Sequence, residues 1–309
     1  MKLPMSSDGT FYAAPSALET CLGRVTWGVA PGYCICAPSA LKLGSVPLAT
    51  PQKDRNRNFV ASEISKTQID RLGDRLRKGD ITEADLRLLD EYRRSFSESY
   101  EFVVTAIRSE LGLAPTGRPA KSTTSISEKL LRESIRLTQI QDIAGCRLIV
   151  PTIMDQESVV QSLSQLLGKV TIVDRCKQPS HGYRAIHVIT ESESRVVEIQ
   201  IRTSLQHIWA ELSEKLADII DPGIKYGGGS ERIRDFLART SKLIDVEESN
   251  EKNLANKRAR LSLQDSPKYR DELQKIAVLE REFTALRKEI FAVLQDTIDK
   301  VPEIAQEER

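Results

Sequence analysis

The stretch RVVEIQIRT at residues 195–203 decides the fold class, because apolar and polar side chains alternate along it. In a β-strand, successive side chains point to opposite faces of the sheet. One face would carry three aliphatic residues and the other an acid, an amide and a base: Val197, Ile199 and Ile201 against Glu198, Gln200 and Arg202. The pattern predicts a strand with one buried face and one face that a ligand can use. Taken alone, it also fits a half-exposed antiparallel strand whose outer side chains have no function.

Two more runs rich in β-branched residues have the same character, DIAGCRLIV at 142–150 and HGYRAIHVI at 181–189. In the second run, a period of two places Tyr183, Ala185 and His187 on one face. The wider pattern predicts an alternation of strands and helices: strand 145–151, helix 155–167, strand 169–175, strand 183–190, strand 195–202 and helix 203–219. We therefore expect an α+β (mixed α/β) fold, in which a mixed β-sheet is flanked by helices.

Three regions follow from composition and period. Residues 1–58 are rich in Pro and Gly and have no period, which predicts a weakly ordered N-terminal extension. Residues 59–229 form the predicted main domain. It opens with a helix that ends at Gly79, a second helix that begins at a capping box from Thr82 to Asp85 and breaks near Ser95, and, after the breakers of 112–119, a helix over 125–132.

Residues 230–309 are polar and predicted to be helical. Six apolar residues in this region step by three and four: Ile276, Leu279, Phe283, Leu286, Ile290 and Val293. Such a seam is typical of a helix that packs along its length, either on its own domain or on another subunit. Both alternatives are open at this point.

Composition excludes several classes of protein. The 309 residues carry a formal net charge of only +1, so no whole-molecule basic field draws in nucleic acid. An anionic ligand would need a local cluster, and six basic residues do lie within 118–147. No apolar run approaches the ~20 residues that span a bilayer, and the five cysteines lack metal-binding spacing. We expect a cytoplasmic protein with reduced thiols and no membrane partner.

The motifs D-x-x-x-x-R (142–147), G-Y-R-x-x-H (182–187) and V-E-I-Q-I-R-T (197–203), followed by a Trp-bearing helix, resemble the synthetase domain of the RelA/SpoT family. The likeness runs from about Ser62 to about Gly229. It implies a nucleotidyltransferase-like core that transfers the β,γ-pyrophosphate of ATP to the 3′-hydroxyl of GDP or GTP, with Mg²⁺, to make (p)ppGpp. The chain has three histidines and no His-Asp dipeptide, so the resemblance is to small stand-alone synthetases rather than to relatives with a hydrolase domain.

The resemblance also implies roles for single residues. Asp142 and Glu198, which are the only acids within the strand motifs, match the metal-binding Asp and the Glu that contacts metal and helps to deprotonate the attacking hydroxyl. Six residues match the ATP side, with the first and last flanking adenine: Arg118, Lys121, Ser125, Lys129, Arg132 and Arg147. Four match the acceptor side, with the first stacking on guanine: Tyr183, His187, Gln200 and His207. The chain departs from the family by one extra residue between Arg118 and Lys121 and by His181 at the usual Asn position.

Two alternative functions remain open. Some small synthetases that this chain resembles pyrophosphorylate other nucleotides or the tRNA 3′ CCA end as growth-arresting toxins, which would add an antitoxin to the partners. The other alternative is a catalytically degenerate protein that only binds a nucleotide or a partner, although the presence of both Asp142 and Glu198 argues against it. Because similar small synthetases often assemble through terminal helices, we also expect a homo-oligomer formed through the C-terminal helices.

Overall fold

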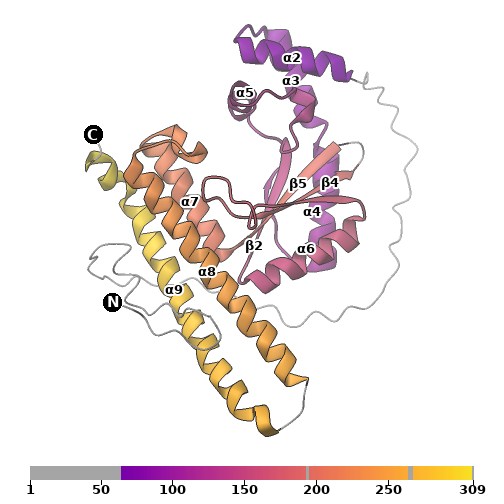
Figure 1. Ribbon diagram of the computed structural model, residues 1–309. Coiled ribbons are helices and arrows are strands. Elements are labelled where there is room, and N and C mark those ends of the chain that lie inside the picture. Colours follow the sequence, from indigo (N-terminus) through magenta and orange to yellow (C-terminus); the bar gives the residue numbers. More distant parts are fainter. Residues whose placement is uncertain (1–63, 193–194, 264–266, 308–309) are drawn as a thin grey trace. The chain divides into compact units, whose positions relative to one another are not determined.

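A five-stranded mixed sheet forms the centre of the computed structural model, which describes residues 64–192, 195–263 and 267–307 (Figure 1). The predicted extension over 1–58 lies outside these residues. The strands lie in the order β1-β2-β5-β4-β3, with β2 and β5 parallel and the other pairs antiparallel. Their bounds are Thr116–Arg118 (β1), Ala144–Val150 (β2), Val170–Asp174 (β3), Ile186–Ser192 (β4) and Arg195–Thr203 (β5). The predicted α+β fold with a mixed sheet is confirmed.

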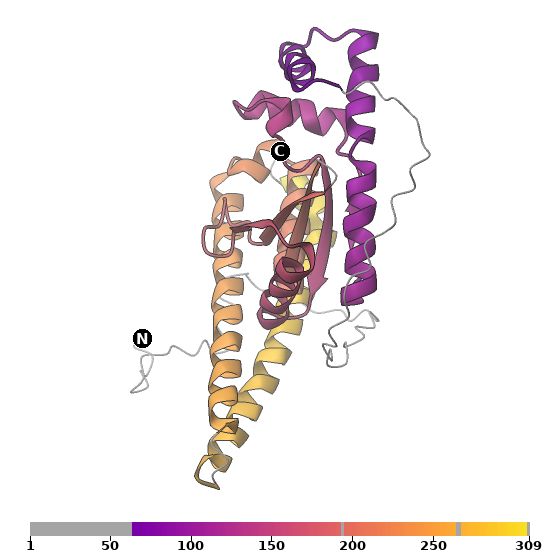
Figure 2. The same cartoon turned by 90° about the vertical axis from the view of Figure 1, so that its right-hand side faces the viewer.

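The aliphatic face of β5 lies in the core, as its alternation predicts. Val197, Ile199 and Ile201 are fully buried. Helices α4 (Ser97–Leu111) and α6 (Ile153–Leu167) pack on this side of the sheet, and Figure 2 shows α4 running along it. Burying each such side chain contributes about 1.5–3 kcal/mol, so this face fixes which way β5 points. The opposite face, with Glu198, is therefore directed toward the site.

The helices before the sheet begin and end where the sequence predicts. Helix α2 (Lys66–Lys78) ends at Gly79, whose φ of 74° is the left-handed conformation of a typical C-cap. Helix α3 (Glu83–Arg94) begins at a complete capping box between Thr82 and Asp85. A break at Ser95 separates α3 from α4, as expected.

The segment after α4 departs from the prediction. Within the breakers of 112–119, Thr116–Arg118 form the edge strand β1, which pairs antiparallel with β2. A Cβ on Gly117 would lie 2.3 Å from the Gly145 carbonyl oxygen, so glycine is needed for this close approach. Helix α5 (Thr123–Arg132) follows and buries Ile126 and Leu130 as predicted. A 3-10 turn, η1 (Leu137–Gln139), then leads into β2.

Three long helices follow β5 and pack together: α7 (Ser204–Ile219), α8 (Glu231–Ser262) and α9 (Arg270–Glu307), with the 3-10 turns η2 (Pro222–Tyr226) and η3 (Pro267–Tyr269) between them. Helix α9 lies along α7 and α8 (Figure 1). Ile276 and Ile290 of the predicted seam are each only 2% exposed in the single chain. These positions therefore pack on their own domain, which was one of the two alternatives, while the homo-oligomer remains a prediction. No helix in the described part of the chain is long and apolar enough to cross a membrane.

Candidate active site

The polar face of β5 carries a connected row of three side chains. Gln200 Nε2 donates to Glu198 Oε2 at 2.9 Å, and Arg202 Nη2 donates to Gln200 Oε1 at 3.0 Å. Glu198 is 9% exposed and Arg202 is 3% exposed, so β5 is not the half-exposed strand of the alternative interpretation. Burying a carboxylate and a guanidinium is costly unless hydrogen bonds and opposite charges compensate. The row therefore belongs to a built polar site.

A second chain of hydrogen bonds joins this row to β4 and the turn before it. His187 Nδ1 lies 2.8 Å from Glu198 Oε1, and His187 Nε2 lies 3.0 Å from the Tyr183 hydroxyl. Arg202 Nη2 donates to the same hydroxyl at 3.0 Å. Arg202 can only donate and the Glu198 carboxylate accepts, so the Tyr183 hydroxyl accepts from Arg202 and His187 Nδ1 donates to Glu198. Four of the polar groups thus form one continuous path that ends at Glu198.

The expected common strand face of Tyr183, Ala185 and His187 is only partly correct. Strand β4 begins at Ile186, so Tyr183 and Ala185 lie in the preceding turn. Ala185 is fully buried and cannot touch a ligand. Tyr183 and His187 still meet edge to face, with ring centroids 5.8 Å apart.

Asp142 lies in the turn before β2, between two lysines. Lys121 Nζ donates to Asp142 Oδ2 at 2.6 Å and Lys129 Nζ donates to Asp142 Oδ1 at 2.9 Å. Burial raises the pKa of Asp142, but the two ammonium groups outweigh burial and lower that pKa to about 2. The carboxylate is therefore ionised at neutral pH, and two cations are held at one point.

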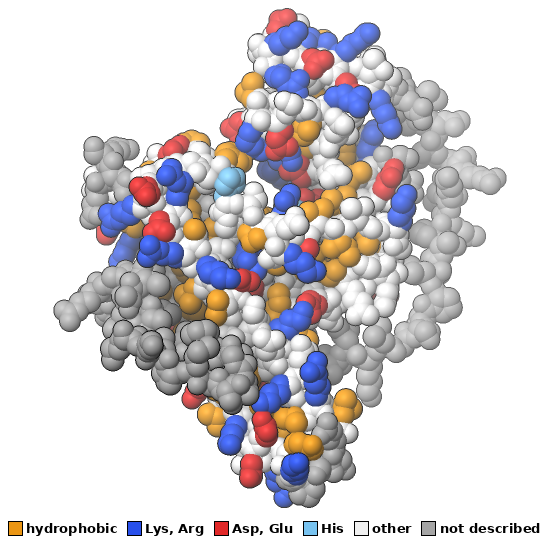
Figure 3. All heavy atoms as spheres, in the orientation of Figure 1, with side chains coloured by type: hydrophobic (Ala, Val, Ile, Leu, Met, Phe, Trp, Pro, Cys, Tyr) orange, Lys and Arg blue, Asp and Glu red, His pale blue; other side chains and the backbone are white. Residues whose placement is uncertain are grey.

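Helix α5 brings Lys129 to this point because its apolar stripe faces the core. Two other residues predicted for the ATP side, Ser125 and Arg132, make different contacts. Ser125 Oγ accepts from Ser122 Oγ at 2.8 Å, near the start of the helix. Arg132 pairs with Glu133 at 2.9 Å, and its guanidinium lies 3.9 Å from the centre of the Tyr226 ring. Figure 3 shows basic and acidic side chains close together in a hollow beneath α5.

The two arginines expected to flank adenine lie on neighbouring strands. Arg118 on β1 is exposed and pairs in register with Gly145, while Arg147 on β2 pairs with Thr116 on one side and with Gln200 on the other. Burial lowers the pKa of Arg147, and the nearby charge of Arg202 lowers it further. The sheet thus places Arg147 beside the polar row of β5.

His207 lies near Arg147, which is half-buried, and Arg202, which is buried. Burial, Arg147 and Arg202 lower the pKa of His207 to about 4, so its imidazole is neutral at pH 7. Its Nε2 lies 3.3 Å from Glu211 Oε1. Several buried nitrogens of this group have no hydrogen-bond partner among the described residues: Nε of Arg147, Nε and Nη1 of Arg202, and Nδ1 of His207. Buried polar groups are nearly always paired, so these atoms indicate a place where a polar ligand binds.

The donor set suits a magnesium ion held partly by substrate. Among the described residues, no group of three or more His, Cys, Asp and Glu side chains could hold a metal by itself. Magnesium typically binds one or two carboxylates together with substrate phosphates and water. Burial and, to a smaller extent, the nearby charge of Asp142 raise the pKa of Glu198, although His187 and Gln200 keep that pKa below its ordinary value. A cation between the two carboxylates would relieve their repulsion.

Two residues of the site, Arg202 and Tyr226, are not predicted from the sequence. The sequence places Arg202 on the polar face of β5 but indicates no role for it. Its period-two spacing from Gln200 is the signal that could have identified it. Tyr226, which covers Arg132, lies 94 positions away along the chain and carries no local signal. The residues that the sequence did predict for the site all lie on or beside β1, β2, α5, the 181–185 turn, β4, β5 or α7.

A comparison with known protein families shows which family this domain resembles. The model described as the region found in RelA / SpoT proteins matches residues 117–217. The likeness to RelA/SpoT proteins that the motifs predicted is therefore confirmed over residues 117–217.

Individual relatives are similar over that domain. The uncharacterized protein Rv1366 of Mycobacterium tuberculosis is 32% identical over 148 residues, which cover 46% of this chain and 54% of the relative. The GTP pyrophosphokinase YjbM of Bacillus subtilis is 33% identical over 142 residues, covering 41% of this chain and 64% of that protein. The crystal structure of small alarmone synthetase 1 from B. subtilis aligns with a TM-score of 0.41 and 28% identity, over 57% of this chain and all of that one. The chain thus spans about half the length of the first of these relatives.

Proposed function

We propose that this protein transfers the β,γ-pyrophosphate of ATP to the 3′-hydroxyl of GDP or GTP. The observation that carries the proposal is the proximity of two groups: Asp142 with its two lysines in the turn before β2, and the buried, ionised Glu198 on β5, which is hydrogen-bonded to His187. Two relatives from B. subtilis are named GTP pyrophosphokinases, which supports the reaction class. The proposal that the acceptor is a nucleotide is supported by Tyr183 and by the unpaired nitrogens of Arg147, Arg202 and His207.

The ATP side provides charge neutralisation. Lys121 and Lys129 converge on Asp142 with side chains 14% and 20% exposed, so they are held in place before a ligand arrives. Ammonium groups fixed in this way stabilise the charge that develops on a transferring phosphoryl group. Mg²⁺ bound by Asp142 and Glu198 with phosphate oxygens would supply further neutralisation there.

The acceptor side provides a base and a flat surface for stacking. The ionised Glu198 accepts the proton of the 3′-hydroxyl as the new bond from that oxygen to the β-phosphorus forms. The bond between the β-phosphorus and the bridging oxygen breaks, and AMP leaves with the electron pair. His187, which donates to Glu198, keeps the carboxylate oriented, and its own orientation is fixed by Tyr183. The Tyr183 ring stacks on the guanine base, a contact worth ~1–3 kcal/mol.

The direct test is pyrophosphate transfer from labelled ATP by the purified protein, with GDP, GTP or deacylated tRNA as acceptor. We expect AMP and a pyrophosphorylated guanosine nucleotide in equal amounts. We also expect Glu198→Gln to lower turnover by ~10²–10⁴-fold, as is usual when a positioned base is lost. Glu191→Gln, an exposed acid on β4, is the matched control and should keep wild-type turnover.

Three results would contradict the proposal. Turnover within tenfold of wild type in folded Glu198→Gln protein would remove Glu198 from catalysis. Transfer to tRNA alone would favour the toxin alternative, and the absence of transfer to every acceptor would favour a degenerate nucleotide-binding protein.

A further inference from the structure

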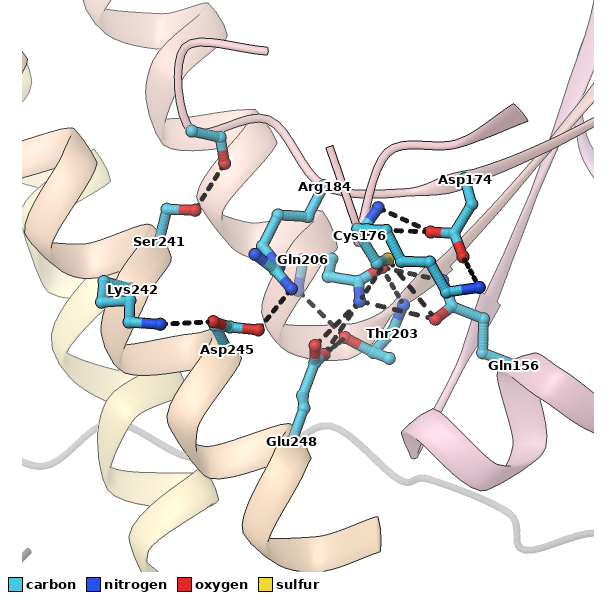
Figure 4. A network of polar contacts seen from close by, with 12 residues as sticks. Gln156, Asp174, Cys176, Arg184, Thr203, Gln206, Ser241, Lys242, Asp245 and Glu248 are labelled. Atoms are coloured by element: carbon cyan, nitrogen blue, oxygen red, sulfur yellow. Dashed lines mark hydrogen bonds and ion pairs between the residues drawn. The ribbon is translucent and has the colours of Figure 1, made fainter. Parts of the chain in front are cut away.

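One face of α8 is lined by polar side chains that contact the acceptor side of the site. Ser241, Asp245 and Glu248 are spaced by four and three residues and therefore lie on the same side of the helix. Ser241 is 5% exposed and Glu248 is 4% exposed. Figure 4 shows these three side chains pointing from α8 toward the turn that carries Arg184 and toward the end of β5. A buried polar helix face of this kind needs partners, and each of the three has one.

The first partner is the turn at Gly182. Ser241 Oγ donates to the Gly182 carbonyl oxygen at 2.6 Å. Gly182 has a φ of +90°, and a Cβ at this position would lie 2.7 Å from Cζ2 of Trp209. Trp209 is fixed in turn, because its Nε1 donates to the Leu237 carbonyl oxygen on α8 at 2.9 Å. The turn is therefore held closely between α7 and α8.

The second partner is Arg184, two residues further on. Arg184 Nη2 donates to Asp245 Oδ1 at 2.6 Å, and Lys242 Nζ donates to Asp245 Oδ2 at 2.8 Å. The Arg184 side chain is 10% exposed and the Asp245 side chain 29%, so this charge-assisted bond is partly shielded from water. Tyr183 lies between the two anchored residues, and its backbone is fixed on both sides by the same helix.

The third partner is the junction of β5 and α7. Glu248 Oε1 accepts from Thr203 Oγ1 at 2.5 Å, and the Glu248 carboxylate also accepts from Gln206 Nε2 at 2.9 and 3.0 Å. Thr203 directly follows Arg202, which donates to the Tyr183 hydroxyl. The same face of α8 thus fixes both segments that meet at Tyr183. Lys121 and Lys129, by contrast, are held by Asp142.

We propose that α8 is the positioning element of the acceptor site, with Ser241 and Asp245 as positioning residues that set the orientation of Tyr183. The inference rests on the proposed function, since it assigns acceptor affinity to residues that touch no substrate. It makes α8 part of the recognition of the nucleoside acceptor and separates the determinants of acceptor binding from those of ATP binding.

The test compares two aspartates on α8. Asp245→Ala removes the carboxylate that pairs with Arg184, while the control Asp235→Ala removes an exposed carboxylate that pairs with Arg239 at 2.7 Å. We expect Asp245→Ala to raise the KM for the guanosine acceptor by about tenfold and to leave the KM for ATP within about twofold. Asp235→Ala should change neither. Equal rises in both KM values, or an unchanged acceptor KM, would overturn the proposal.

Amide hydrogen exchange provides a readout that needs no turnover. Peptides that cover 180–187 should exchange faster in Asp245→Ala than in wild type, while peptides of α5 should be unchanged. Unchanged exchange at 180–187 would show that Asp245 does not hold the turn. If wild type makes no product, the proposed function fails but the exchange experiment still decides the anchoring. If Asp245→Ala does not fold, Ser241→Ala, which removes one hydrogen bond, should give the same pattern to a smaller extent.

Discussion

Replacing Asp142 by Asn should destabilise the protein as well as inactivate it. The Asp142 side chain is 24% exposed and binds two ammonium groups at 2.6 and 2.9 Å. In the variant, Lys121 and Lys129 stay largely buried and face each other without a negative charge between them. Removing one partner of a buried ion pair leaves an uncompensated charge, which is strongly destabilising.

The size of the effect follows from the pKa of Asp142, which falls from an ordinary 3.8 to about 2. Since each pKa unit corresponds to 1.36 kcal/mol, the ionised form contributes about 2 kcal/mol to the free energy of unfolding at pH 7. The folded pKa is the lower one, so this contribution is present above pH 3.8 and is lost as the pH falls toward 2.

Urea unfolding at pH 7 measures the difference. We expect Asp142→Asn to lower the free energy of unfolding by about 2 kcal/mol, with the difference from wild type shrinking below pH 3.8. The control, Asp74→Asn, removes an acid whose side chain is 62% exposed and pairs with Arg77 at 3.1 Å, and it should change stability by less than ~0.5 kcal/mol. An Asp142→Asn protein as stable as wild type would refute the reasoning, because burial of the carboxylate would then cancel its attraction to the lysines.

Three further predictions concern the rest of the domain. Tyr183→Ala should weaken acceptor binding by about 10–100-fold, from a lost stacking contact, while ATP binding measured by calorimetry is unchanged; equal losses would indicate collapse of the whole site. The pKa of His207 is about 4 in the folded protein and 6.5 is its ordinary value. As the pH falls from 7.5 to 5, the free energy of unfolding of wild type should therefore drop by about 2 kcal/mol more than that of His207→Gln. Parallel curves of unfolding free energy against pH for the two proteins would contradict this. Ile290→Asp, at a position 2% exposed, should lower the melting temperature without changing the mass found by light scattering; a lower mass at an unchanged melting temperature would make the seam a subunit interface.

Local pattern was sufficient for most of the fold and much of the site. The alternation in 195–203 identified both the buried face of β5 and the acid on its other face, because period two is a property of the backbone itself. The capping box at Thr82 and the C-cap at Gly79 marked helix ends for the same local reason. The pairing of Lys121 and Lys129 with Asp142 was not predicted, since no local rule joins residues on different elements.

What could not be predicted depends on contacts between distant segments. Gly117 reads as a breaker in the sequence, although in the structure it permits the close pairing of β1 with β2. The bond between Arg184 and Asp245 joins residues 61 positions apart and leaves no periodic signal. The seam of α9 has the same spacing whether its partner is another helix of the chain or another subunit, so only the buried positions in the structure distinguish the two.

The parallel pairing of β2 with β5 has a consequence for the order of events in folding. In this pairing Gly145 lies opposite Glu198, which brings Glu198 near Asp142, three residues before Gly145. The paired residues are 53 positions apart, and closing so long a loop makes this contact slow to form. A slip of one residue would turn Glu198 to the opposite face of the sheet. An intermediate that has formed only its helices therefore has no functional site, and recovery of activity during refolding should follow closure of the central strand pair.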